Sequence, residues 1–372
     1  MTAEVLASGA PAERIGHHVW LHLMDGKVVI THAGKAIAQH PLRAWILAVS
    51  RIAEPLLLRD TVWEEQESGA LVRSRALMHL ARRHRRAGRV RGGGEGARMI
   101  ELPEVVTLAR QMNEALNGKR VASANRGNSP HKWVFYNRPP EEFAKIPVGK
   151  TVGEVRGEAK WIFAPLEPGF VLLIGETGGR VLFHQDERTI PQRYHLLLGF
   201  EDGTCLTVAV QGWGSILLVT KAELAGHPAA RGTSPLSDAF TYEWFKRLLQ
   251  EYEGRDKKSV KELIISGPGI SGIGNGYLQD ILFRARVHPT RKVAEITGRE
   301  CRRLYDATRR TMKEAVRLDG RDTERDLYGN PGRYRAVLDK RAKGKPCREC
   351  GTAIEKIAFL GGAAYFCPGC QM

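Results

Sequence analysis

Two pairs of cysteines near the end of the chain constrain its structure most strongly. They form two CxxC motifs separated by sixteen residues: Cys347, Cys350, Cys367 and Cys370. Each motif can present two thiolates to one ion, and two motifs complete a tetrahedral shell without an open position. We therefore expect one structural Zn²⁺ per chain on a β-hairpin with Gly361-Gly362 near its tip, with redox thiols as the alternative. Cys205 and Cys301 lie in strand and helix patterns and are expected to be packed thiols.

The charge balance indicates a polyanionic partner. Among 372 residues there are 57 Lys and Arg against 41 Asp and Glu, a formal net charge of +16. A large protein with this excess usually binds nucleic acid, although a basic surface can also serve solubility alone. The sequence shows neither a secretion signal nor an apolar run long enough to span a membrane. We expect a cytoplasmic protein of several domains.

Residues 1–98 differ in character from the rest of the chain. The stretch "VWLHLMDGKVVITHAGKAIAQH" has the pattern of β-strands, with Asp25-Gly26 as a hairpin turn. A helical pattern follows near 41–58. Residues 72–98 are rich in Arg and then in Gly, which predicts a helix that gives way to a basic linker. This linker either contacts phosphates or serves as a solvated connector.

The pattern of apolar residues divides the remainder into a β-rich part and a helical part. A helix is predicted over 103–118, with Pro103 in its first turn and Gly118 at its end. Its apolar face comprises Val105, Leu108, Ala109, Met112 and Leu116. Residues 119–220 read as paired strands of a sandwich or barrel, and residues 232–330 as helices.

A turn with five glycines joins two of the predicted helices. It lies within "SGPGISGIGNGYLQD", where Asn275 stands at the start of the second helix. We expect its side chain to cap that helix while the backbone N–H groups face outward. Free backbone N–H groups at a helix N-terminus form an anion site, which would suit a DNA phosphate. An ordinary tight helical turn is the alternative.

Three blocks in one order carry a family resemblance. "IELPEVVTL", then "GISGIGNGYLQDILFRARVHP", then the four-cysteine hairpin resemble the bacterial formamidopyrimidine-DNA glycosylase and endonuclease VIII family over about 99–372. The resemblance implies an α+β multidomain protein with four parts. They are an extension (1–98), a β-sandwich domain (99–231), a helix–two-turn–helix domain (232–345) and a zinc finger (346–372).

The resemblance also implies a function. It predicts a DNA glycosylase, with or without AP-lyase activity, that flips a damaged base out of duplex DNA. The expected protein is monomeric and associated with the bacterial nucleoid. The alternative is a catalytically impaired relative that recognises lesions or structured DNA without cleaving it.

The family's catalytic residues map onto the start of the motif. Glu101 matches the acid/base that acts on the sugar, while Ile100 stands where the family has a terminal proline as nucleophile. An α-amino group titrates near ~8, so a chain terminus suits this attack, but within a continuous chain the nitrogen is an amide. Two origins of residues 1–98 remain open: a fused domain, faintly resembling the small barrel of some transposon integrases, or an upstream frame before a start at Met99. Lys160 matches the family's β-hairpin lysine, which reaches the phosphate and the active site, with an ordinary surface lysine on a strand as the alternative. Lys160 is also the substitute nucleophile if burial lowers its pKa.

The DNA-binding residues match the family in part. Asn275 is retained, and Trp213 is expected to insert into or stack on DNA. Glu176 stands where the resemblance implies an apolar wedge, and Gly362 where it implies an arginine that grips phosphates. The loss of that arginine predicts weaker binding with a smaller salt dependence.

Overall fold

The computed structural model describes residues 99–129, 133–225, 232–266 and 269–372, and the backbone of six strands in the N-terminal segment. The chain divides into two compact units, Met1–Gly94 and Glu95–Met372. The first holds an antiparallel sheet in the order β1 (Pro11–Arg14), β2 (His17–Met24), β3 (Lys27–His32) and β4 (Lys35–Pro41). It also holds a hairpin of β5 (Thr61–Glu64) and β6 (Leu71–Ser74).

These strands confirm the β pattern predicted before residue 41. The turn expected at Asp25-Gly26 lies outside the described residues, and so do the helix expected near 41–58 and the linker expected within 72–98, apart from Pro41 at the end of β4 and residues 72–74 in β6. Residues 72–74, which we expected to begin a helix, belong instead to strand β6, where they pair with β5.

The second unit begins with helix α4 (Leu102–Leu116), close to the predicted 103–118. Glu104 accepts the N–H of Glu101 at 2.9 Å and so satisfies a donor at the helix start. The predicted apolar face is buried along its whole length. Gly118 follows the helix with φ of +83°, a conformation that glycine adopts without strain.

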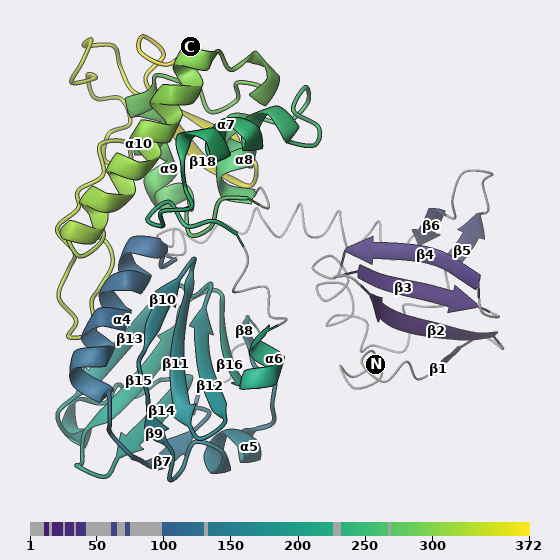
Figure 1. Cartoon of the computed structure of the whole chain (residues 1–372), viewed down its shortest axis with the longest axis vertical. Coiled ribbons are helices and arrows are strands. Elements are labelled where there is room, and N and C mark those ends of the chain that lie inside the picture. The colour runs from purple at the N-terminus through teal and green to yellow at the C-terminus, as the bar shows by residue number, and fades with distance from the viewer. Residues whose placement is uncertain are drawn as a thin grey trace. The chain divides into compact units, whose positions relative to one another are not determined.

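Two sheets form the predicted β-sandwich (Figure 1), and their strands are antiparallel except for one pair. The larger contains β8 (Val134–Phe135), β9 (Thr151–Val152), β10 (Arg156–Glu158), β11 (Trp161–Glu167), β12 (Phe170–Gly175) and β16 (Gly214–Thr220). The smaller contains β7 (Val121–Asn125), β13 (Gly179–His184), β14 (Leu196–Phe200) and β15 (Cys205–Val210). Strand β8 alone pairs in parallel, with β16. Strands β12 and β13 are consecutive in the chain but belong to different sheets, so the turn at 176–178 crosses from one sheet to the other.

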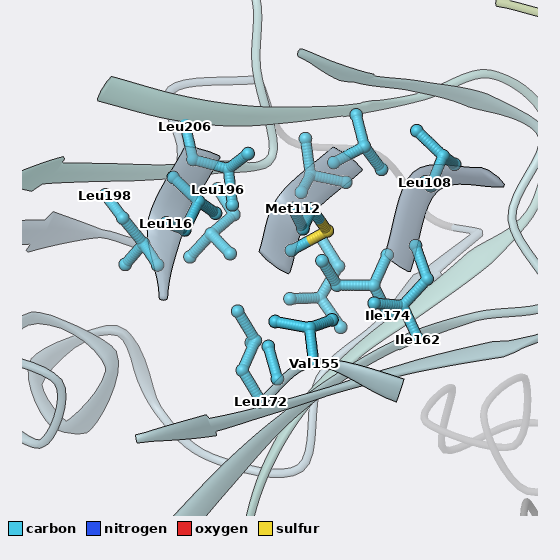
Figure 2. Packing of buried hydrophobic residues seen from close by; sticks show 14 of the residues in the cluster. Leu108, Met112, Leu116, Val155, Ile162, Leu172, Ile174, Leu196, Leu198 and Leu206 are labelled. Atoms are coloured by element: carbon cyan, nitrogen blue, oxygen red, sulfur yellow. The ribbon is translucent and has the colours of Figure 1, made fainter. Parts of the chain in front are cut away.

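Helix α4 packs its apolar face into the core between these sheets (Figure 2). Leu108, Met112 and Leu116 from the helix meet Leu172 of the larger sheet and Leu196 of the smaller. Short helices α5 (Pro140–Lys145) and α6 (Lys221–Ala225) flank the sandwich. The burial of this continuous apolar surface is the main stabilising contribution to the domain.

A second hydrophobic core belongs to the helical domain. Its helices are α7 (Tyr242–Glu251), α8 (Val260–Ser266), α9 (Asn275–Ala285) and α10 (Gly298–Arg317). Thr297 caps α10 by accepting the N–H of Glu300. The helical core also includes Leu102, whereas Ile100 belongs to the sandwich core. The chain therefore anchors one domain at residue 100 and the other at residue 102, with Glu101 between them.

The chain ends in the predicted hairpin, formed by β17 (Glu355–Phe359) and β18 (Gly362–Phe366). Contacts from β18 to α9 attach it to the helical domain, including a hydrogen bond from Gln279 to the carbonyl of Ala363. Throughout the described part of the chain, no helix is both long and apolar enough to cross a lipid bilayer.

Candidate functional site

Glu101 lies at the junction of the two domains, and its carboxylate is held by the helical domain. Its side chain is 4% exposed, and its two oxygens accept the N–H groups of Gly274 at 2.6 Å and Gly276 at 2.8 Å. Gly274 and Gly276 flank the first residue of α9, where the helix dipole favours negative charge. The helix start is thus an anion site, and the anion that it holds is Glu101.

This arrangement corrects one detail of the sequence interpretation. We expected the N–H donors at the start of α9 to face outward toward a DNA phosphate, with Asn275 as the cap. Gly274 occupies the cap position instead, and the donors on either side of Asn275 bind a carboxylate of the same chain.

The turn before α9 needs glycines because its backbone lies very close to residues of the sandwich domain. A Cβ atom at Gly272 would lie 2.6 Å from Cβ of Leu102 and 2.9 Å from the carbonyl of Ala159, and Gly272 has φ of +84°. A Cβ atom at Gly274 would lie 2.8 Å from the carboxyl carbon of Glu101. These positions tolerate no side chain while the two domains keep this contact.

A buried arginine, which sequence reasoning missed, completes the surroundings of Glu101. The guanidinium of Arg321 lies 3.5 Å from Glu101 and 3.2 Å from Glu104, and it donates to the carbonyl of Met99 at 2.6 Å. Glu104 also accepts the hydroxyl of Tyr277 at 2.5 Å. Burial raises the pKa of Tyr277, and the adjacent Glu104 raises it further, so the phenol stays neutral and donates. No motif marks Arg321, because it lies 217 residues from Glu104.

Ile100 stands in the sandwich, not in an open site. Its side chain is 2% exposed, and its backbone N–H donates to the carbonyl of Thr177 at 2.9 Å. Met99 pairs with Gly178 in an isolated β-bridge. The nitrogen of Ile100 is therefore an engaged peptide amide, which has no nucleophilic lone pair.

Lys160 lies in the turn between β10 and β11, and its side chain is partly exposed. The preceding Ala159 has φ of 53°, an uncommon conformation for a residue with a side chain, and its carbonyl faces the glycine turn. The carbonyl of Lys160 accepts the N–H of Glu176 at 3.1 Å. Lys160 is thus held beside the glycine turn and the sheet-crossing turn at 176–178.

Trp213 lies in the turn between β15 and β16, next to the same crossing turn. Its carbonyl accepts the N–H of Gly178 at 2.8 Å, and its ring packs against Phe135 with centroids 4.8 Å apart. The structure therefore gathers Trp213, Glu176 and Lys160 around the segment that begins at Met99.

Asn275 meets the tip of the zinc hairpin rather than Glu101. A Cβ atom at Gly362 would lie 2.9 Å from the Asn275 amide nitrogen, so the absence of a side chain at 362 makes room for this amide. Nearby, the ammonium of Lys261 donates to the carbonyl of Phe359 at 2.8 Å. Burial lowers the pKa of Lys261. Sequence reasoning did not single out this lysine.

The four predicted zinc ligands meet in one cluster. Their sulfur atoms all lie within 4.8 Å of one another, with Cys347 and Cys370 at 3.8 Å and Cys350 and Cys367 at 3.4 Å. Zn–S bonds of about 2.3 Å in a tetrahedron place the sulfurs about 3.8 Å apart, so the cluster fits this ion. The cysteines form a structural zinc site, as predicted. Cys205 and Cys301 are buried free thiols, also as predicted.

Comparison with known proteins identifies all three parts of the second unit. Residues 99–211 match the formamidopyrimidine-DNA glycosylase N-terminal domain, and residues 232–326 match the H2TH domain of the same enzymes. Residues 344–371 match the zinc finger found in FPG and IleRS.

Whole-chain comparisons agree with these domain matches. The formamidopyrimidine-DNA glycosylase of Chloroflexus aurantiacus is 30% identical to this chain, and that of Chloroflexus aggregans is 31% identical. Each alignment covers 74% of this chain, and it covers 98% of the first relative and 99% of the second. A Lactococcus lactis Fpg crystallised with DNA containing N7-benzyl-Fapy-dG has the same fold, with a TM-score of 0.66 at 23% identity over 73% of this chain and 99% of its own. A second crystal structure, of the Lactococcus lactis Fpg in complex with DNA that contains an abasic site, has a TM-score of 0.65 at 23% identity over the same shares of the two chains. Relatives that align over nearly their full length agree with all three domain models, so the chain belongs to the formamidopyrimidine-DNA glycosylase family.

Proposed function

We propose that this protein is a DNA glycosylase that removes damaged bases from duplex DNA. The observation that carries the proposal is the placement of Glu101, a buried carboxylate fixed by two backbone amides where the two domains meet. Relatives that match nearly end to end are formamidopyrimidine-DNA glycosylases, and structural neighbours hold DNA with a damaged base or an abasic site. A family member that binds lesions without cleaving them is not favoured.

Glu101 is the proposed acid/base for the sugar of the flipped nucleotide. When the bond between C1′ and the base nitrogen breaks, its electron pair leaves with the base, and C1′ must gain a bond to a nucleophile. A carboxylate beside the sugar can transfer protons to and from it, a contribution typically worth about 10²- to 10⁴-fold in rate.

Lys160 is the proposed amine for any covalent step. The nitrogen of Ile100 cannot attack, because it is an amide engaged with Thr177. A lysine amine attacks C1′ only in its neutral form, and the resulting Schiff base permits strand cleavage by elimination. Without that attack, water supplies the oxygen for C1′, and the product is an uncut abasic strand.

The proposed DNA contacts come from both domains. Lys160 and Trp213 belong to turns of the sandwich, and Asn275 to the start of α9 beside the zinc hairpin. Trp213 would stack on bases, Lys160 and Asn275 would contact the backbone, and the net charge of +16 would attract the duplex. We infer that the protein acts as a monomer on nucleoid DNA, with zinc as a purely structural ion.

The test is base release from duplexes with a single formamidopyrimidine, 8-oxoguanine or oxidised pyrimidine. We expect release by the full chain, loss of at least about 100-fold in Glu101→Gln, and less than about threefold change in DNA affinity. Glu114→Gln is the control, because Glu114 lies on α4, the helix that follows Glu101, but is exposed. Duplex binding without base release on all of these substrates would overturn the proposal.

Borohydride trapping on the same duplexes, and on one with an abasic site, decides the nucleophile. A covalent adduct that disappears in Lys160→Ala supports attack by this amine. Base release without an adduct assigns the attack to water instead and removes the lyase step from the proposal.

A further inference from the structure

Arg321 lies within salt-bridge distance of three buried carboxylates. Its guanidinium lies 3.5 Å from Glu101, 3.2 Å from Glu104 and 3.7 Å from Glu324. The three carboxylate side chains are each at most 4% exposed, and that of Arg321 is 11% exposed. Buried carboxylates without a cation would repel one another at a large cost in free energy.

The guanidinium also touches the backbone beside Glu101. One of its nitrogens, Nη2, donates to the carbonyl of Met99 at 2.6 Å, and the backbone N–H of Arg321 donates to Glu104 at 3.0 Å. The guanidinium lies 5.1 Å from the centre of the Tyr277 ring, within the range of a cation–π contact. One side chain thus holds the peptide before Ile100 and the carboxylate after it.

Gly276 provides the space for this arrangement. A Cβ atom there would lie 1.6 Å from Nη1 of Arg321 and 2.7 Å from Oε1 of Glu101. The N–H of Gly276 binds that same Oε1. A side chain at position 276 would therefore displace the guanidinium, the carboxylate or both.

We propose that Arg321 is a positioning residue of the base-excision site. Its guanidinium fixes the Glu101 carboxylate in one orientation and balances the negative charge of that carboxylate at the domain junction. The proposal rests on the proposed function of Glu101. Arg321 acts through Glu101, Glu104 and the Met99 carbonyl, not on the substrate.

The geometry requires an arginine rather than any cation. The guanidinium engages Glu101 through Nη1, Glu104 through Nε and Met99 through Nη2 at once. A lysine ammonium is a compact charge on a flexible stem and cannot keep these three separated contacts. Arg321→Lys therefore retains the charge and removes the geometry.

The experiment measures single-turnover base release, DNA affinity and thermal stability for four variants of the full chain. We expect Arg321→Lys and Gly276→Ala to slow base release about 10- to 100-fold while DNA affinity changes less than about threefold. Arg321→Met, which removes the charge as well as the geometry, should slow base release at least as much as Arg321→Lys does. The double variant Gly276→Ala/Arg321→Met should be no slower than Arg321→Met, because both changes remove the same contact.

Leu249→Ala is the control for stability. Leu249 is buried in the helical core on α7, so this change lowers the melting temperature without touching the site. Its rate should equal that of the wild type below the melting transition. If Arg321→Met does not fold, Arg321→Lys and Gly276→Ala still test the proposal.

Two results are distinguishable. If the wild type releases base and both Arg321→Lys and Gly276→Ala match its rate, Arg321 has no positioning role and the proposed function stands. If the wild type releases no base from any lesion duplex, the proposed function fails, and this proposal fails with it.

Discussion

The carboxylate of Glu101 accepts the N–H of Gly276 at 2.8 Å across 175 residues of sequence. Glu101 precedes the first helix of the sandwich domain, whereas Gly276 lies in the first turn of α9 in the helical domain. The site around Glu101 is therefore complete only when both domains are folded and in contact.

Gly272→Ala should disrupt this contact. The new methyl group would meet Leu102 at 2.6 Å, and alanine is strained at φ of +84°. We expect a loss of about 2–4 kcal/mol in unfolding free energy and a matching loss of base release, measured by denaturant titration and single-turnover kinetics. Gly118→Ala is the control, because Gly118 has φ of +83° but nothing within 4 Å of its Cβ position. It should cost only about 1 kcal/mol, and equal losses in the two variants would contradict the steric explanation.

Met112→Ala should destabilise the sandwich without altering the site. Met112 is fully buried between the two sheets (Figure 2), so the truncation leaves a cavity. We expect a loss of about 2–5 kcal/mol in unfolding free energy. Arg110→Ala, on the exposed face of the same helix, should cost less than about 1 kcal/mol. A loss below about 1 kcal/mol in Met112→Ala would contradict the packing described for this core.

Removal of zinc should release the hairpin from the helical domain. Cys367→Ala deletes a fully buried ligand, and we expect loss of stoichiometric zinc together with faster hydrogen exchange at 355–366. The bond from Lys261 to the Phe359 carbonyl should then be lost, and DNA affinity should fall at least about tenfold. Cys205→Ala is the matched control, because its buried thiol lies in β15, outside the cluster. Full zinc content in Cys367→Ala would be decisive against this site.

His184 should make stability depend on pH. Its ring nitrogens lie 2.9 Å from the Thr189 hydroxyl and 2.8 Å from that of Thr207, and burial lowers its pKa in the folded state. The unfolded chain then binds a proton more readily than the folded chain does. The contribution of His184 to the unfolding free energy is fully present above its pKa in the unfolded chain, about 6.5. It decreases as the pH falls toward the lower pKa of the folded state.

The measurement is the unfolding free energy at pH 7.5 and at pH 5. We expect a smaller difference between these values in His184→Asn than in the wild type, since the variant has no proton to gain at this position. An unchanged difference would show that His184 titrates alike in both states.

The sequence predicted the elements of the described residues well where local patterns are strong. The face from Val105 to Leu116 is buried as its 3.6-residue spacing predicts, because an amphipathic helix must place that stripe on a core. The cysteine spacing predicted the zinc site, because a CxxC turn brings its own thiolates together. Resemblance to a family supplied Glu101, Lys160 and Trp213, which no local pattern distinguishes, whereas Asn275 was also indicated by its place at the start of a helix after the glycine turn.

Tertiary structure decided the site itself. The sequence by itself determined helix α4, the strands, the metal ligands and a glycine turn before α9, because each depends on residues close together in the chain. Only the fold placed Arg321 against Glu101, directed the helix N-terminus toward that carboxylate and engaged the Ile100 nitrogen with Thr177. These contacts join residues as far apart in the chain as Glu101 and Arg321, and burial and charge pairing at such separations arise when two cores pack together, not from local sequence.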